Sequence, residues 1–294
     1  MNKSRLKKYL VTGILAMLIV CPSGMLAQQR YCVAACDWMM LKRQKLGEFQ
    51  LAKDIRADGV EMDMGPLGQR VLFENKLRDP HFQQLFRRTA DSLGIQVPSM
   101  AMSGFFAQSF LGRENYKELI QDCLSSMDVM GAKIAFLPLG GCGKEWQQPG
   151  EAHNEMVRRL HEVGEMAASS GKVIAIRTSL HACANIKLLK EVNSKGIKIY
   201  YNLQDAVDQG LNPYKELKKL GRDRIAQIHA SLTDSVTLDK DPRIDLHQVK
   251  QVLDKMKWTG WLVVERSRNA QDVRNVRANF GTNVAYLKEI FQQE

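Results

Sequence analysis

The stretch that decides the fold is GKVIAIRT, residues 171–178. A glycine that can end a helix precedes an apolar run from Val173 to Ile176, and the run ends on Arg177. A short, uninterrupted apolar run is typical of a parallel strand that is buried on both faces. The segment therefore predicts a buried strand whose carboxyl end carries a positive charge.

The same order of helix end, glycine and strand recurs along the chain, in DSLGIQV (91–97), VMGAKIAF (129–136), SKGIKIYY (194–201) and WTGWLVV (258–264). Glycine is the usual residue where a helix stops, because it adopts a left-handed conformation without steric cost. The runs that predict buried strands number eight: 31–36, 59–64, 95–102, 132–139, 172–178, 197–202, 224–230 and 261–266.

The segments between these runs show helical periodicity. Apolar residues recur at three- and four-residue steps in 114–130 and 151–170, and again in the last helix, at Val284, Leu287 and Ile290. Eight strand–helix units without a low-complexity linker predict one domain, a (β/α)₈ TIM barrel over residues 28–294. The alternative is a doubly wound open sheet, but the glycine-rich phosphate loop usual in that fold does not follow the first strand.

The N-terminus has the pattern of a secretory signal peptide. Four basic residues in 1–10 precede a short apolar run, and Ala27 is a small residue suited to cleavage. We expect residues 1–27 to be removed and the protein to be exported, to the periplasm or another extracytoplasmic site. Lipid anchoring at Cys21 is a lesser alternative, because Val20 lies where lipoprotein signals usually have a small residue. The apolar run is too short for a stable membrane span.

Composition excludes several classes of protein. Loss of residues 1–27 lowers the net charge from +10 to about +6, and the remaining basic residues alternate with acidic ones along helices. Such runs indicate solvated helix faces, so we expect no nucleic-acid partner. Five cysteines remain after cleavage and none forms a CxxC pair, so a disulfide-built fold or a thiolate zinc site is not expected.

In a TIM barrel the functional groups lie at the carboxyl ends of the strands. At those ends the sequence places a histidine, an arginine, an amide and several carboxylates, together with smaller or apolar residues: Asp37, Trp38, Glu61, Asp63, Met102, Ser103, Gly140, Gly141, Arg177, Asn202, His229 and Glu265. These residues come from distant parts of the chain. They predict a polar, ligand-sized barrel mouth.

The quoted stretch, with RIAQIHASL (224–232) and GWLVVERS (260–267), resembles the xylose isomerase-like TIM-barrel superfamily, the family of sugar phosphate isomerases and epimerases. DGVEMD (58–63) and MGAKIAFLPLGG (130–141) also look typical of that family. The resemblance extends over most of the mature chain and is sharpest from about 172 to 290. It implies a small-molecule carbohydrate as the ligand and no nucleotide cofactor.

The resemblance also implies a divalent metal held by Glu, Asp, His and Glu at the ends of the last four strands. The fourth ligand matches Glu265 and the third His229, but Asn202 stands in place of the Asp and Arg177 in place of the first Glu. A guanidinium has no lone pair to offer a metal. We therefore expect either no cofactor or a weakly bound Mn, Mg or Zn ion on His229, Glu265 and Asn202.

Two functions remain open. In the first, the protein is an exported isomerase, epimerase or lyase that abstracts a proton next to a carbonyl, with Arg177 as the electrophile and Glu265 or His229 as the base. In the second, it is a non-catalytic carbohydrate-binding barrel in which Arg177 and Glu265 form a salt bridge across the mouth. Further substrate-binding candidates are Asn202, Glu61, Asp63, Trp38 and His181. The sequence does not decide the oligomeric state.

Overall fold

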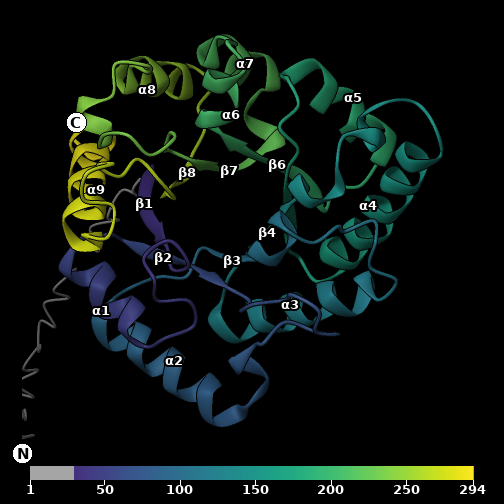
Figure 1. Cartoon of the computed structure of the whole chain (residues 1–294), viewed down its shortest axis with the longest axis horizontal. Coiled ribbons are helices and arrows are strands. Elements are labelled where there is room, and N and C mark those ends of the chain that lie inside the picture. Colours follow the sequence, from purple (N-terminus) through teal and green to yellow (C-terminus); the bar gives the residue numbers. More distant parts are fainter. Residues whose placement is uncertain (1–29, 294) are drawn as a thin grey trace, which may run out of the picture.

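The computed structural model describes residues 30–293, and within them eight parallel strands close into a barrel in sequential order. Figure 1 shows the strands around a centre and the helices outside them. The predicted TIM barrel is confirmed, and each predicted run overlaps one strand, although β8 begins one residue before its run. The strands are β1 (Tyr31–Cys36), β2 (Gly59–Asp63), β3 (Ser99–Ala101), β4 (Ile134–Pro138), β5 (Val173–Arg177), β6 (Ile197–Asn202), β7 (Ile225–His229) and β8 (Gly260–Val264).

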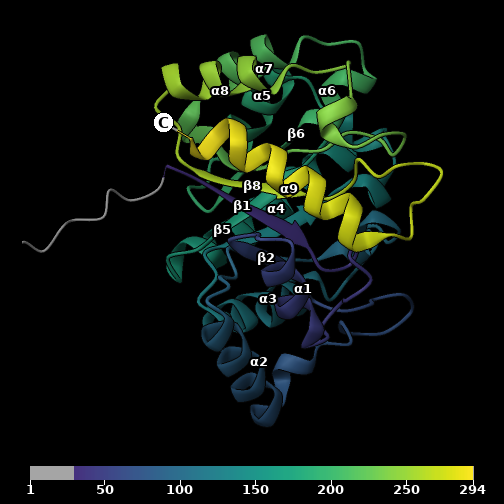
Figure 2. The same ribbon diagram turned by 90° about the vertical axis from the view of Figure 1, so that its left-hand side faces the viewer.

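The outer layer consists of α1 (Gly47–Asp54), α2 (Pro80–Leu93), α3 (Tyr116–Met130), α4 (Glu151–Ser169), α5 (Ala182–Val192), α6 (Leu203–Asp208), α7 (Pro213–Leu220), α8 (Leu246–Lys255) and α9 (Val276–Gln292). The regular alternation is interrupted after β6, where the short helix α6 precedes α7. In the side view α9 crosses in front of β1 and β8 (Figure 2), the first and last strands, which pair to close the barrel.

Alternation along the strands separates two apolar cores. Val33 and Ala35 of β1 belong to the large core between barrel and helices, whereas Ala34 and Cys36 belong to a smaller cluster with Phe136 and other residues inside the barrel. Successive side chains of a strand point to opposite faces, so this split follows from strand geometry. It places every second residue of each strand in the barrel interior.

The glycines before the strands have two different roles. Gly94 and Gly131 end α2 and α3 in the left-handed conformation, as the sequence predicts. The helix before β6 differs, because α5 already ends at Val192 and the left-handed residue there is Asn193. Gly196 instead allows two backbones to approach closely, since a Cβ at this position would collide with the carbonyl oxygen of Gly164 in α4.

Three sequence expectations concern the signal peptide, a membrane-spanning helix and the cysteines. The predicted signal peptide, including Cys21 and Ala27, lies outside the described residues. In residues 30–293 there is no helix long and apolar enough to cross a membrane. Cys32, Cys36, Cys123, Cys142 and Cys183 are all free thiols.

Candidate functional site

Three ionisable side chains, from the carboxyl ends of β5, β7 and β8, meet inside the carboxyl end of the barrel. Arg177 ends β5, His229 ends β7, and Glu265 follows the last residue of β8. His229 lies beside Val263 of β8 in the strand register, so Glu265 is two residues further along the same inward face. The barrel thus brings together the three residues that the sequence predicts as catalytic.

Arg177 is held by two carboxylates. Its Nη2 and Nε donate to Asp205 in α6 at 2.7 and 3.0 Å, and its Nη1 lies 3.4 Å from Glu265 Oε2. Burial disfavours the charged guanidinium, but the hydrogen bonds to Asp205 and the charge of Glu265 outweigh it, so the pKa of Arg177 is raised. The side chain is a fixed cation at the barrel mouth, with the face of Phe106 at 5.5 Å.

His229 lies between two carboxylates. Its Nε2 is 3.0 Å from Glu61 Oε1, and its Nδ1 is 3.5 Å from Glu265 Oε2. The His229 side chain has no exposed surface, and that of Glu265 is 5 % exposed. Glu265 Oε2 therefore lies within 3.5 Å of both the imidazole and the guanidinium of Arg177. The carboxyl group of Glu265 thus links the imidazole to the guanidinium.

The Glu61 side chain is fully buried and accepts several side-chain hydrogen bonds. Its Oε2 accepts hydrogen bonds from Ser99 Oγ at 2.6 Å, from Tyr200 Oη at 2.9 Å and from Gln227 Nε2 at 3.3 Å. Burial, together with the neighbouring Glu61 carboxylate, raises the pKa of the Tyr200 phenol well above its ordinary value. The phenol therefore stays protonated and remains a donor to Glu61.

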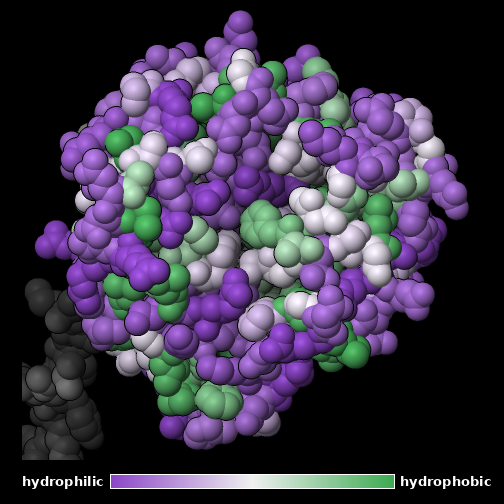
Figure 3. All heavy atoms as spheres, viewed as in Figure 1, coloured by the Kyte–Doolittle hydropathy of each residue, from purple (hydrophilic) through white to green (hydrophobic). Residues whose placement is uncertain are grey.

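Aromatic rings form the wall around these charges. Trp38 stacks on Phe136 with ring centroids 6.3 Å apart, and Phe136 meets His229 edge-on at 5.0 Å. Phe106 contacts Phe136 from the rim and is among the few exposed large apolar residues. The space-filling view mixes hydrophilic and hydrophobic residues around the barrel centre (Figure 3). A mouth of this kind suits a sugar, which presents C–H faces to aromatic rings and hydroxyls to charges.

The donors at the mouth do not fit a divalent metal of the family type. Asn202 uses its side-chain oxygen to cap α6, accepting from the backbone N–H of Gln204 at 2.8 Å. Arg177 contributes a positive charge where a carboxylate ligand would be needed, which repels a cation. Among residues 30–293 no group of three or more His, Cys, Asp or Glu side chains could hold a metal ion.

Asp63 lies apart from this site, although it is only two residues from Glu61. Its carboxylate accepts from the backbone N–H groups of Gly65 and Ser103 and pairs with Arg43 at 3.0 Å. Burial raises the pKa of Asp63 to about 7. Asp63 therefore organises the loops that follow β2 and β3, and its side chain does not contact the Arg177–Glu265–His229 cluster.

Two further buried acids lie next to Asp63, at the ends of β1 and α1. Burial raises the pKa of Asp37 to about 6 and that of Glu48 well above its ordinary value, and the charge of Asp37 adds to the effect on Glu48. The two carboxyl groups face one another, and outside this pair neither oxygen of Glu48 has a hydrogen-bond partner of ordinary geometry among the described residues. One of the two acids must carry a proton for them to share a hydrogen bond.

The remaining candidates occupy other positions. His181 is exposed and caps α5, with its Nδ1 accepting from the backbone N–H of Ala184 at 3.4 Å. Trp38 is part of the aromatic wall described above. The sequence reasoning missed Asp205 and three inward-facing polar residues, Ser99, Tyr200 and Gln227. Strand alternation could have revealed the latter three, because each is a polar residue on the interior face of a buried strand.

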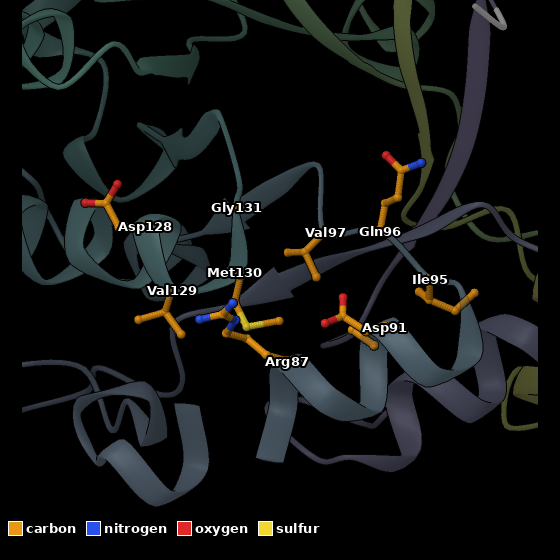
Figure 4. A pocket seen from close by; sticks show the side chains of 10 residues that line it. Arg87, Asp91, Ile95, Gln96, Val97, Asp128, Val129, Met130 and Gly131 are labelled. Carbon is orange, nitrogen blue, oxygen red and sulfur yellow. The ribbon is translucent and has the colours of Figure 1, made fainter. Parts of the chain in front are cut away.

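A cavity of about 410 Å³ lies at the opposite end of the barrel, between the last turns of α2 and α3. Figure 4 shows Arg87, Asp91 and Asp128 among the side chains around it. Its lining includes residues 95–97 and 128–131, which precede β3 and β4. The cavity is therefore separate from the carboxyl-end site.

Comparison with known proteins agrees with the fold. The model of the xylose isomerase-like TIM barrel family matches residues 49–290. The chain belongs to the xylose isomerase-like TIM barrel family. No curated protein sequence matches the chain.

Solved structures of sugar-converting enzymes share this fold. D-psicose 3-epimerase, solved in the presence of D-fructose, is 11 % identical with a TM-score of 0.70 and covers 89 % of this chain and 100 % of its own. The 3-keto-D-glucoside 4-epimerase of E. coli is 15 % identical with a TM-score of 0.68, covering 88 % and 99 %. A sugar phosphate isomerase/epimerase from Parabacteroides distasonis is 10 % identical with a TM-score of 0.64, covering 90 % and 95 %. At these identities the likeness concerns the fold.

Proposed function

We propose that the protein is an exported sugar isomerase, epimerase or lyase that moves a proton next to a carbonyl at the carboxyl end of the barrel. The observation that carries the proposal is the position of Glu265, with one carboxylate oxygen 3.4 Å from Arg177 and 3.5 Å from His229. Enolate formation needs a base that removes the proton and a positive charge that stabilises the enolate oxygen, and these two groups lie side by side here. The substrate class is a keto-sugar or another small carbohydrate.

Arg177 acts as the electrophile. Its Nε and Nη2 are engaged by Asp205, so Nη1 is the nitrogen directed toward the acid–base pair. A guanidinium presents several N–H donors in one plane and suits a carbonyl or carboxylate oxygen. As the base removes the proton from the neighbouring carbon, negative charge develops on that oxygen and is stabilised by Arg177.

Glu265 and His229 supply the base from one side of the mouth. Because the two groups touch, a proton taken by one can pass to the other. A single base on one face can return the proton to the former carbonyl carbon while the neighbouring hydroxyl passes its hydrogen to the former carbonyl oxygen, which gives isomerisation. Alternatively it can give the proton to a hydroxyl on the next carbon, which departs as water, and this gives elimination. Inversion by two bases needs a second acid across the mouth from β8, where Phe136 of β4 and Phe106 after β3 present rings. We therefore place isomerisation and elimination ahead of two-base epimerisation.

The reaction requires no resident metal in this proposal, because the cation is part of the chain. Dialysis against EDTA is expected to leave both activity and thermal stability unchanged. Metal analysis of protein purified without chelator would show less than one ion per chain. Stoichiometric Mn, Mg, Zn or Co in that sample would overturn this part of the proposal.

Solvent exchange tests the proposed chemistry directly. The purified protein is incubated with a panel of keto- and aldo-sugars in deuterated water, and deuterium next to the carbonyl is followed by NMR. Exchange that disappears in Glu265→Gln, with the fold retained by circular dichroism, supports the proposal. The absence of both exchange and product over a broad panel contradicts it.

The second candidate is a non-catalytic carbohydrate-binding barrel. It is favoured by one observation, the neutralisation of Arg177 by Asp205 and Glu265, which satisfies its charge without a ligand. Calorimetric binding of a sugar without any exchange would identify this function.

Export is the remaining part of the proposal and rests on the N-terminal sequence. Cells that express the full chain are expected to accumulate it outside the cytoplasm, with Gln28 as its first residue. N-terminal sequencing after cell fractionation checks this. An intact Met1 in a cytoplasmic fraction would contradict export.

A further inference from the structure

We propose that Glu61 is a positioning residue that fixes His229 as the Nε2–H tautomer and so reserves Nδ1 for proton exchange with Glu265. This inference rests on the proposed function for its catalytic meaning, but its geometry stands independently. Glu61 Oε1 is 3.0 Å from His229 Nε2, and neither side chain has exposed surface.

The direction of the hydrogen bonds around Glu61 follows from their donors. Gln227 Nε2 can only donate, and it lies 2.8 Å from Ser99 Oγ and 2.9 Å from Tyr200 Oη. Each hydroxyl therefore accepts from Gln227 and passes its own hydrogen to Glu61 Oε2. Glu61 Oε2 is therefore an acceptor in each of these three contacts, as expected of a carboxylate.

A hydrogen-bond acceptor that faces Nε2 determines the tautomer of the His229 imidazole. A neutral histidine carries its hydrogen on one nitrogen, and the nitrogen that faces a carboxylate is the one that donates. Nε2–H therefore points at Glu61 and the Nδ1 lone pair points toward the mouth. Nδ1 has no hydrogen-bond partner of ordinary geometry among the described residues, and its neighbour is Glu265 Oε2 at 3.5 Å.

The consequence for the reaction is a defined path for one proton. The proton leaves the carbon next to the carbonyl for Glu265 or Nδ1 and is exchanged between these two atoms, while Glu61 balances the positive charge of His229 when both of its nitrogens are protonated. No proton has to reach Glu61. Its task is to hold the ring in one orientation and one tautomer.

Nitrogen-15 NMR of the histidines tests the inference without any substrate. Spectra of the protein labelled at histidine, with the His229 signals assigned from a His229→Gln variant, report which nitrogen carries the hydrogen. We expect Nε2–H in the wild-type protein. An Nδ1–H tautomer there would overturn the inference whatever the protein catalyses.

Glu61→Gln provides the second test. A Gln side chain can donate to Nε2 through its amide, which permits Nδ1–H to donate to Glu265. We expect a change toward the Nδ1–H tautomer and, if the enzyme turns over a sugar, about a 10- to 100-fold lower kcat with little change in KM. Glu48→Gln is the matched control, because it makes the same change at an equally buried acid remote from the site and should alter neither tautomer nor kcat.

Tyr200→Phe covers the case in which Glu61→Gln does not fold. It removes one donor to Glu61 and keeps the carboxylate, so Nε2–H is expected to persist with a smaller loss of kcat. A tautomer that stays Nε2–H in a folded Glu61→Gln protein overturns the positioning role. If the tautomers behave as expected but no sugar exchanges deuterium, the proposed function fails and the positioning of His229 by Glu61 stands.

Discussion

Arg177 makes two parallel hydrogen bonds to Asp205, from Nη2 at 2.7 Å and from Nε at 3.0 Å. The two residues lie on consecutive units of the barrel, one at the end of β5 and the other in the first turn of α6. A bidentate pair of this kind fixes the plane of the guanidinium. Asp205 thereby decides which N–H groups of Arg177 remain for Glu265 and for a ligand.

Replacement of Asp205 by Asn is expected to lower the free energy of unfolding by about 2 kcal/mol, because a charge-assisted bidentate contact is weakened and Arg177 is left partly uncompensated. The Arg177 side chain should also become mobile, which reduces sugar affinity or kcat. Denaturant unfolding and titration calorimetry measure the two effects. Asp208→Asn, on the exposed side of the same helix, should change stability by less than about 0.5 kcal/mol. Equal effects of both variants would contradict the role of Asp205.

Replacement of Arg177 by Glu is expected to create a metal site. The new carboxylate would join His229 and Glu265, and the charge at this position would change by two units, from a cation to an anion. Titration calorimetry with Mn²⁺ should detect one binding event in the variant and none in the wild-type protein. Arg177→Leu is the control, because it removes the cation without adding an oxygen or nitrogen ligand. Comparable Mn²⁺ binding by wild type and Arg177→Glu would show that Arg177 does not prevent metal binding.

Stability is expected to fall as the pH rises from about 4 to about 7. Burial raises the pKa of Asp37 to about 6 and that of Asp63 to about 7, so in this window the folded state binds protons that the unfolded state has released. Each such acid stabilises the folded state at low pH, and this contribution is lost as the pH rises past the pKa of the acid in the folded protein. Thermal unfolding as a function of pH measures this trend.

Glu48→Gln should flatten that pH dependence, because it removes one buried acid and supplies a permanent amide donor to Asp37. We expect the variant to exceed the wild type by about 1–3 kcal/mol at pH 7.5 and to match it near pH 4. A variant that is less stable than the wild type at pH 7.5 would show that the ionised Glu48 is well accommodated.

The close approach of α4 to the loop before β6 predicts a sharp difference between two glycines. Gly196→Ala would place a methyl group against the carbonyl oxygen of Gly164, and should cost about 3 kcal/mol or more through displacement of the backbone. Gly94→Ala meets no atom within 4 Å and should cost about 1 kcal/mol, from its left-handed conformation alone. Chemical denaturation distinguishes the two. A cost at Gly196 no larger than that at Gly94 would contradict the close contact.

Much of the fold could be predicted from local patterns. The eight apolar runs and the helical periodicity between them are properties of neighbouring residues, so they can be recognised without knowledge of the tertiary structure. The sequence pattern placed the end of α5 at Gly196, whereas Asn193 adopts the left-handed conformation and ends the helix first. Position 196 requires glycine because α4 approaches it closely. This helix lies some 30 residues earlier in the chain, on the order of one strand–helix unit.

The site could be predicted only in part. A charged or polar residue at a strand end indicates a position at the barrel mouth, and Arg177, His229 and Glu265 do meet there. Asp63 has the same local pattern as Glu61, yet it pairs with Arg43 in a loop. The sequence does not distinguish them, because the side chain that a strand-end carboxylate contacts depends on loop paths.

The sequence by itself determined the barrel, the strand ends that form its mouth, and the presence of a cation, Arg177, at one of those ends. Only the tertiary structure decided the partners of that cation. Asp205 was inconspicuous in the sequence, as was the donor network of Ser99, Tyr200 and Gln227 beneath Glu61. The physical reason is that strand periodicity fixes which way a side chain points, whereas a hydrogen bond requires two atoms from separate elements to meet within about 3 Å.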